Sequence, residues 1–442
     1  MRAHAHPSTH HTTNPDVDRP PHRRRSLRTI AALTVTVLTL AALAPTPATA
    51  SASAGPGTTD PARDPAVIAR WNEVAMDVLT PSGRPLLTQP FVVATMHVAM
   101  YDAVVAVEGG YRPFRTTVPA PPGASSTAAA AQAAHDVLVA YLPASAAVFD
   151  AALVESLAAV PDGTGELQGR AVGQAAAAAT LADRAGDGSQ SGPVPPMRDP
   201  GPGVWAPTPP ATAGLTPWLA YARPFTMRAP DQFRPKPPPG LGSTRYRRAV
   251  DEVRRLGAAV APERTADQTL VARFWADQPI AQNQRALRNH AVQLDWDISA
   301  TARLFAASLT SLGDAIIACW DAKYHYQLWR PWQSVPTVEP GWAPLLGTPN
   351  HPEFPSAHGC VTGSLGYTLS WLMGTDEIDL TIDAANLGGL TRHFPTRLDL
   401  LTEVGEARIW GGLHYRFSVD AGLHLAHRVV TNNLSRNFRP VE

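Results

Sequence analysis

Two long cationic side chains, Lys323 and Arg330, stand seven residues apart in the segment KYHYQLWRP. Seven residues are about two helical turns, so the spacing predicts both cations on one helix face, with Pro331 ending the helix. Two cations on one face repel each other unless an anion lies between them. A solvated basic face is the alternative, but three nearby tryptophans favour a partly buried wall that binds an anion.

A second polar cluster lies in the segment HPEFPSAHG, residues 351–359. Pro355 and Ser356 predict a helix start. The amides of residues 356–358 would then point out of a helix N-terminus, which favours an anion, and Ser356 adds a hydroxyl donor. His358 in the first turn is unfavourable as a cation unless an anion is bound beside it. A capping serine followed by an ordinary histidine is the alternative for this segment taken alone.

The third cluster joins Arg408 and His414 in the segment RIWGGLH. The glycine pair at 411–412 predicts a break after the preceding helix and permits close backbone approach. His414 then lies just before the last helix, where one ring nitrogen can bind a metal while an acceptor holds the other. These two residues mean little without the other two clusters.

The three clusters together supply three fixed cations, one hydroxyl, one helix N-terminus and two histidines. Such donors suit a tetrahedral or trigonal-bipyramidal oxyanion, because arginine gives planar multidentate contacts and lysine a point charge. We therefore expect the three stretches to converge in one pocket.

The ordered set Lys-x6-Arg-Pro, Pro-Ser-x-His and Arg-x5-His resembles the vanadium-dependent haloperoxidases and the related type 2 phosphatidic acid phosphatases, most specifically over residues 310–436. The resemblance implies a vanadate cofactor, a site that phosphate can also occupy, and hydrogen peroxide, halide and a small organic molecule as substrates. It implies that His414 is the covalent ligand of vanadium and that His358 is the acid–base group. The remaining oxyanion partners would be Lys323, Arg330, Ser356, the amide of Ala357, and Arg408.

Two positions depart from the family pattern. Ala357 stands where related proteins usually have glycine, so an extra methyl group narrows the site. The common His-x3-Asp pattern is absent, because Ser418 lies four residues after His414, and Asp420 is the carboxylate that could serve instead.

Two further residues bear on the halide. His351 resembles a second histidine of algal bromoperoxidases, which favours bromide and iodide over chloride, although an ordinary loop histidine is an equal alternative. Trp320 matches a tryptophan of the family's halide pocket, and a core tryptophan accounts for it equally well.

Residues 1–50 have the features of a cleaved secretory signal peptide: a basic start, an apolar run over 29–44 and the small-residue pattern Ala-Thr-Ala at 48–50. Its arginine pair is a weak sign of the twin-arginine route. We therefore expect a secreted protein, with no membrane contact after cleavage. The remaining chain would carry 31 basic and 35 acidic residues, which argues against a nucleic-acid partner.

The two cysteines, Cys319 and Cys360, exclude a disulfide scaffold. They could form a single bridge in an oxidising compartment, or stay as two buried thiols, which we favour.

Helical periodicity predicts an all-α fold, a helix bundle with long Pro-rich connections. The resemblance implies that the bundle is of the vanadium haloperoxidase and acid phosphatase type. We divide the chain into a flexible lead (51–62), an N-terminal helical region (63–192), a connection (193–240) and a C-terminal helical region (241–442). Residues 193–239 hold 15 of the 44 prolines and form either a linker or a lid. No run alternates cleanly enough to predict a sheet, and residues 376–382 are either a strand or a turn.

The expected helices cover 65–79, 91–107, 126–141, 146–159, 165–185, 243–257, 265–277, 282–309, 311–329, 356–373 and 416–436. A homo-oligomer is also plausible, because related enzymes are often dimers or larger.

Three functions fit the sequence. The first is a haloperoxidase. The second is a phosphatase that uses the same pocket, and the lack of an uninterrupted apolar run of 18 residues after residue 50 weighs against its membrane-bound relatives. The third is a non-catalytic anion-binding protein, in which Ala357 and the missing aspartate are signs of decay.

Overall fold

The computed structural model describes residues 60–441. The predicted signal peptide and residues 51–59 of the predicted lead lie outside this range, so both stay predictions, as does secretion. Residues 61–63, where the lead meets the N-terminal helical region, form a 3-10 turn.

The described chain is mainly helical, which confirms the all-α prediction. The α-helices are α1 (Ala66–Leu79), α2 (Gln89–Glu108), α3 (Ser126–Tyr141), α4 (Ala146–Leu157), α5 (Thr164–Arg184), α6 (Thr244–Leu256), α7 (Ala266–Phe274), α8 (Pro279–Leu294), α9 (Ile298–Tyr326), α10 (Pro331–Ser334), α11 (Ala357–Met373), α12 (Arg397–Trp410) and α13 (Arg416–Leu434). The 3-10 helices are η1 (Pro61–Arg63), η2 (Leu86–Thr88), η3 (Pro143–Ser145), η4 (Pro217–Tyr221), η5 (Pro230–Phe233), η6 (Val335–Thr337) and η7 (Ala385–Leu387). Two strands complete the fold, β1 (Glu377–Ala384) and β2 (Leu390–Thr396).

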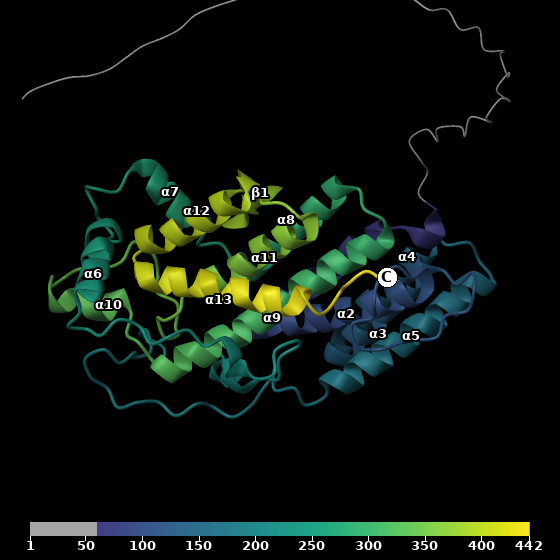
Figure 1. Cartoon of the computed structure of the whole chain (residues 1–442), viewed down its shortest axis with the longest axis horizontal. Helices are drawn as coiled ribbons and strands as arrows, with labels where there is room; N and C mark the ends of the chain where they lie inside the picture. The colour runs from purple at the N-terminus through teal and green to yellow at the C-terminus, as the bar shows by residue number, and fades with distance from the viewer. Residues whose placement is uncertain (1–59, 442) are drawn as a thin grey trace, which may run out of the picture. The chain divides into compact units, whose positions relative to one another are not determined.

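Helix α9 is the central element, and it packs against α2, α11 and α13 (Figure 1). Both α2 and α9 are apolar on all sides, as expected of helices that are enclosed by neighbours. They are long and apolar enough to cross a membrane, but 89% and 94% of their most apolar stretches are buried inside the fold. Burial in the protein therefore accounts for their composition.

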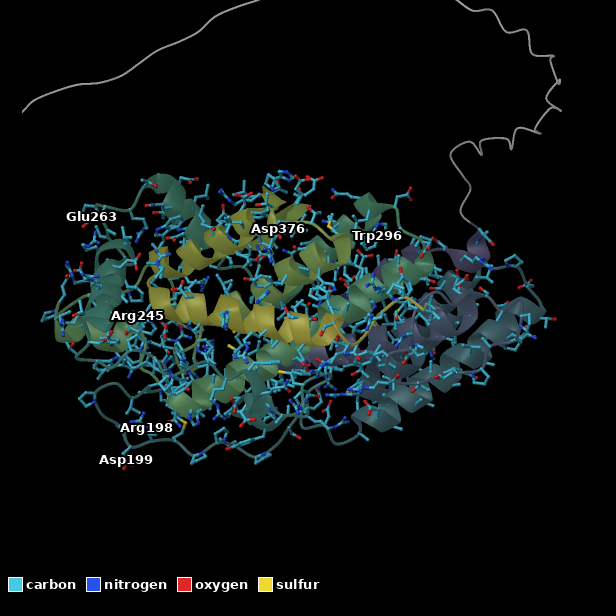
Figure 2. The ribbon with its side chains drawn as sticks, viewed as in Figure 1. Arg198, Asp199, Arg245, Glu263, Trp296 and Asp376 are labelled. Atoms are coloured by element: carbon cyan, nitrogen blue, oxygen red, sulfur yellow. The ribbon has the colours of Figure 1, made fainter. Side chains whose placement is uncertain are left out.

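Helices α3 and α5 pack unusually closely beside α2. A Cβ atom at Gly173 would lie 2.3 Å from the carbonyl oxygen of Ala129, so only glycine permits this approach. The charged side chains Asp199 and Glu263 lie at the periphery of the described chain (Figure 2). The buried apolar residues form a large cluster and a smaller one that includes Tyr246, Phe354 and Tyr415.

The predicted helix break near residue 310 is wrong. Helix α9 runs without interruption from 298 to 326, and the break lies earlier, where Asp295 adopts a left-handed conformation with φ of 48°. Asp297 then caps α9 by accepting a hydrogen bond from the amide of Ala300 at 2.7 Å. The apolar periodicity continues across both helices, so only the capping aspartates mark the boundary.

The strands form an antiparallel hairpin, so the strand alternative for residues 376–382 is confirmed. Its partner β2 was not predicted. Alternate residues of β1 are buried, whereas β2 is mostly exposed and carries little apolar alternation. An edge strand of this kind gives a weak sequence signal.

The Pro-rich connection runs along the C-terminal end of α9 and includes η4 and η5. It is fixed near Leu215, whose amide donates to the Asn350 carbonyl at 2.8 Å and whose carbonyl accepts from Trp320 Nε1 and the Tyr324 hydroxyl, each at 3.1 Å. The connection is thus hydrogen-bonded to residues 320–350 of the C-terminal half. It is more than a linker between two halves.

Candidate functional site

The first candidate cluster is split between two helices, which corrects the prediction of one shared face. Lys323 lies in the last turn of α9, which ends at Tyr326, and Gln327 turns the chain with a φ of 46°. Arg330 is the cap residue of α10, and Pro331 starts that helix instead of ending α9. Proline favours a first helical position, and the sequence alone did not separate this role from a helix end.

Lys323 is fully buried and held by the loop before α11. Its ammonium donates to the carbonyls of Pro352 at 2.8 Å and Glu353 at 3.0 Å, and also to that of Pro355. Burial lowers the pKa of Lys323 to about 8. The lysine therefore fixes this loop and adds positive charge next to it. All three N–H donors of its ammonium are bonded to carbonyls.

Arg330 is fully buried between two histidines. It donates through Nε to the His351 carbonyl at 2.9 Å and through Nη2 to His351 Nδ1 at 3.0 Å. Nη1 donates to the Leu413 carbonyl at 2.9 Å and to His414 Nε2 at 3.1 Å. Burial lowers the pKa of Arg330 to about 10, so it is still a cation at neutral pH.

The tautomer of His414 follows from these partners. Arginine can only donate, so His414 Nε2 carries a lone pair, and Nδ1 carries the proton. Nδ1 donates to Glu353 Oε1 at 2.9 Å. The pKa of His414 is well below its usual value because of burial and then the charges of Arg330, Lys323 and Arg408. A neutral imidazole with an unprotonated Nε2 is the form that binds a metal.

Glu353 is the carboxylate that supports His414, and Asp420, which the sequence left open for this role, is not. Oε1 of Glu353 also accepts the amide of Tyr415 at 3.0 Å, and the residue has no exposed surface. Asp420 is exposed, on the outer side of α13. Burial raises the pKa of Glu353 to about 7, while the nearby cations of Arg330 and Lys323 oppose the rise. The sequence signal that could have identified Glu353 is its position between the Lys323/Arg330 segment and the Arg408/His414 segment.

Ser356 caps α11, which begins at Ala357 as predicted. Its hydroxyl is fully buried and has no partner. The amide of Ser356, however, donates to the Ser418 carbonyl at 3.0 Å and is not free for an anion. A Cβ atom at position 422 would lie 2.5 Å from the Ser356 carbonyl, so Gly422 lets α13 approach this helix start.

Arg408 and His358 meet over one backbone carbonyl. Arg408 Nη1 donates to the Trp275 carbonyl at 2.7 Å, and the same carbonyl faces His358. Nε of Arg408 and Nε2 of His358 are buried without partners. Burial lowers the pKa of Arg408 to about 9 and that of His358 well below its usual value. Trp275 is a residue that sequence reasoning missed, since it contributes a carbonyl.

The glycine pair lies as predicted: α12 ends at Trp410, and Gly412 has a φ of 74°. His414 follows just before α13. The two cysteines are free and buried, and the Cys319 thiol lies 3.9 Å from the Pro355 carbonyl, beneath the Lys323 ammonium.

A cavity of about 400 Å³ opens onto this site. Its lining includes the predicted residues His351, His358, Arg408, His414, Ala357 and Trp320. The ring of Trp320 lies 5.0 Å from that of His351, so both residues proposed for a halide pocket adjoin each other. Lys323, Arg330 and Ser356 are buried behind this lining. The three distant clusters therefore converge.

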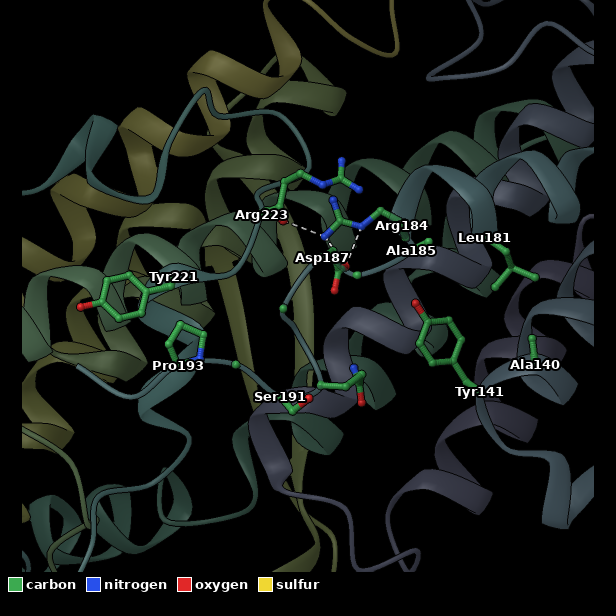
Figure 3. A pocket seen from close by; sticks show the side chains of 14 residues that line it. Ala140, Tyr141, Leu181, Arg184, Ala185, Asp187, Ser191, Pro193, Tyr221 and Arg223 are labelled. Carbon is green, nitrogen blue, oxygen red and sulfur yellow. Dashed lines mark hydrogen bonds and ion pairs between the residues drawn. The ribbon is translucent and has the colours of Figure 1, made fainter. Parts of the chain in front are cut away.

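A second cavity, of about 610 Å³, lies between α3, α5 and residues 186–193 (Figure 3). Its buried cation Arg184 donates to Asp187 at 2.9 Å and to the carbonyls of Pro224 and Arg223 at 3.1 and 2.7 Å. None of the predicted site residues lines it. This cavity offers no free buried cation and is not the oxyanion site.

The residues present fit an oxyanion. Ser356 Oγ, Arg408 Nε and His358 Nε2 are buried without partners, and Arg408, His358 and His414 line the same cavity. Buried polar atoms normally have partners, so these three atoms suit a ligand that supplies them. Cationic and hydroxyl donors around a neutral imidazole suit vanadate or phosphate.

Comparisons with known proteins bear on the fold that carries this site. Residues 303–340 and 336–441 match the family described as the VCPO second helical-bundle domain. The fold is similar to that of a bacterial vanadium-dependent iodoperoxidase, with a TM-score of 0.73 and 24% identity over 85% of this chain and 96% of that one.

Two structures of a bacterial vanadium-dependent chloroperoxidase match less closely. The apo-type and holo-type forms each give a TM-score of 0.63 and 18% identity over 79% of this chain, covering 95% and 91% of theirs. No curated protein matches the sequence significantly. The fold is thus that of the vanadium haloperoxidases, and the resemblance seen in the motifs is confirmed.

Proposed function

We propose that this chain is a vanadate-dependent haloperoxidase, which oxidises halide with hydrogen peroxide to hypohalous acid. One observation carries the proposal: His414 presents an unprotonated Nε2 to a buried pocket that three cations surround. The fold shared with vanadium-dependent iodoperoxidase and chloroperoxidase supports it.

Vanadate would be held by His414 Nε2 and by donors from Arg330, Arg408 and Ser356. When bound, it supplies a Lewis acid that activates peroxide towards halide. Lys323 contributes its charge through the loop that it fixes, because its own donors are occupied. The buried setting strengthens each of these charge interactions relative to water.

The protein's own residues account for the remaining requirements. Glu353 holds the His414 ring through Nδ1, which leaves Nε2 unprotonated and raises its basicity, and the lone pair of Nε2 accepts a hydrogen bond from Arg330. His358 is neutral because of burial, so its unpartnered Nε2 is available to accept a proton from bound hydrogen peroxide. The apolar walls of the cavity limit water near the site.

Bromide and iodide are the proposed halides. The His351 ring accepts a hydrogen bond from Arg330 and lies beside the ring of Trp320. This part of the lining therefore presents a neutral ring next to a cation. Large, polarisable halides are favoured over chloride in such a partly apolar setting, because they lose less hydration energy on burial.

A vanadate-dependence assay tests the proposal. The protein is given hydrogen peroxide, bromide and a phenolic dye, with and without orthovanadate. Bromination that requires vanadate is the expected result. An absence of bromination, iodination and chlorination in vanadate-loaded protein would refute the proposal.

A second candidate function is phosphate-ester hydrolysis in the same pocket. The neutral, Glu353-supported His414 has the form that a histidine nucleophile requires, although the His-x3-Asp pattern is absent. Hydrolysis of a phosphate ester that vanadate inhibits, without halide oxidation, would favour this function.

A further inference from the structure

The cavity at the oxyanion site is also lined by residues from outside the C-terminal region that the family model matches. Leu86 and Leu87 come from η2 in the N-terminal half, and Leu215 comes from the Pro-rich connection. Leu346 and Leu413 face them from the C-terminal half. The floor of the cavity thus belongs to the oxyanion site, whereas the walls combine three parts of the chain.

Away from the oxyanion residues the walls are apolar apart from Asp277 and Gln278, and the side-chain oxygens of these two residues already accept hydrogen bonds. Asp277 pairs with Arg285 at 2.8 Å and accepts the amide of Ala385 at 2.9 Å. The Gln278 side chain caps α8 at the amide of Ala281. Polar atoms whose bonds are already made within the protein give little recognition to a polar ligand.

The two wall tryptophans are occupied in the same way. Trp275 Nε1 donates to Glu403 at 3.0 Å, and Trp320 Nε1 donates to the Leu215 carbonyl at 3.1 Å. Both rings therefore offer apolar faces and no donor. A volume of about 400 Å³ lies within the range of ~300–1,000 Å³ that small-molecule sites have.

We infer that this cavity binds the organic substrate itself, a neutral, electron-rich aromatic molecule that is halogenated before it leaves the protein. The inference rests on the proposed function and deepens it. A neutral aromatic molecule buries its rings against leucine and tryptophan, whereas a charged one would lose its hydration without gaining a partner from the walls.

The chemistry balances with the substrates already proposed. One aromatic molecule, one bromide, one hydrogen peroxide and one proton give one brominated aromatic molecule and two waters. A C–Br bond replaces a C–H bond, the O–O bond of hydrogen peroxide breaks, and two electrons pass from bromide to peroxide. Leu215 is then a specificity-determining residue, because it belongs to the wall and holds no part of the oxyanion.

A competition between matched substrates tests the inference. 2-Naphthol is neutral, and 6-hydroxynaphthalene-2-sulfonate carries a permanent charge on the same ring system. We compare their bromination by the vanadate-loaded protein with their bromination by reagent hypobromous acid. The enzyme is expected to prefer 2-naphthol at least about tenfold more strongly than the reagent does, a difference of ~1.4 kcal/mol.

Substitution in the wall sharpens the test. Leu215→Arg is expected to shift the preference towards the sulfonate by a further tenfold or more, because it places a cation in the wall. Leu241→Arg is the matched control, since Leu241 is 37% exposed and lines a different cavity. It should leave the preference unchanged. If the arginine variant fails to fold, Leu215→Ala replaces it in the test. This variant adds no charge and should weaken 2-naphthol binding.

The outcomes separate the inference from the proposed function. If the protein oxidises bromide but brominates 2-naphthol and the sulfonate in the same ratio as reagent hypobromous acid does, the inference is overturned and the proposed function stands. If the protein oxidises no halide, the proposed function and the halogenation step both fail. Calorimetric titration with 2-naphthol then tests the binding site separately: binding that Leu215→Arg or Leu215→Ala weakens supports an aromatic-binding cavity, and no binding overturns it.

Discussion

Replacing Glu353 with glutamine removes the negative charge behind His414 and leaves the side-chain volume nearly unchanged. Glu353 has no exposed surface, and its Oε1 accepts both His414 Nδ1 at 2.9 Å and the Tyr415 amide at 3.0 Å. A glutamine oxygen can accept the same bonds, but it cannot raise the basicity of the ring as a carboxylate does. The perturbation therefore removes the charge and keeps the two bonds of Oε1, while it places an amide nitrogen at the buried, unpartnered Oε2 position.

The expected effect is a loss of vanadate affinity. Changes in groups that orient a metal-binding histidine typically cost about 10–100-fold in metal affinity. This range corresponds to ~1.4–2.7 kcal/mol, close to the ~1.5–3 kcal/mol of a hydrogen bond to a charged group. Equilibrium dialysis against orthovanadate, followed by vanadium analysis of the protein, measures this change without an activity assay.

Asp420→Asn is the matched control, because it removes the carboxylate that the sequence left open for the same role. Asp420 is exposed on α13, so its replacement should change vanadate affinity less than about twofold, in line with surface substitutions. Equal losses in the two variants, or a loss in Asp420→Asn alone, would refute the assignment of Glu353.

Three further predictions concern the site histidines, the titration of Glu353 and the packing of the core. His414→Ala should abolish vanadium retention, whereas His358→Ala should spare binding and lower turnover by about 10²–10⁴-fold, and equal loss of vanadium in both would contradict their roles. The pKa of Glu353 is raised from 4.5 to about 7, so the wild type should lose unfolding free energy relative to Glu353→Gln as pH rises from about 4.5 to 7 and change little above that; denaturant titrations of the vanadium-free proteins at pH 5 and 8 measure this, and an unchanged difference would contradict it. Phe305→Ala should reduce stability by about 3–5 kcal/mol, because it empties a fully buried position where Phe305 stacks on His97 at 4.8 Å, and a denaturant midpoint near that of the wild type would contradict the packing.

The helices were largely predictable because most are amphipathic or uniformly apolar over long stretches. Their ends were harder to place. The apolar pattern continues through Asp295 and Asp297, and two short polar residues decide where α9 begins. β2 was missed because an exposed edge strand needs no apolar alternation.

The site was predictable in its members and not in its contacts. The spacing of Lys323 and Arg330 suggested one helix, but a left-handed Gln327 separates them and lets Arg330 reach His351 and His414. Glu353 and the Trp275 carbonyl act through contacts between segments 61 and 133 residues apart. Sequence spacing carries no information about such contacts without a fold.

The division into regions at 63–192, 193–240 and 241–442, export and oligomerisation stay predictions. The fold does show that the connection is part of the site, since Leu215 lines the cavity and binds Trp320 through its carbonyl. A linker that only joined two halves would not supply this wall.

The central claim is that one oxyanion binds where the three distant clusters meet. Crystals soaked in orthovanadate, with anomalous scattering measured at the vanadium absorption edge, test it most directly. The account predicts one strong peak within bonding distance of His414 Nε2, next to Arg330, Arg408 and Ser356. A peak elsewhere in the protein, or none at saturating vanadate, would contradict it.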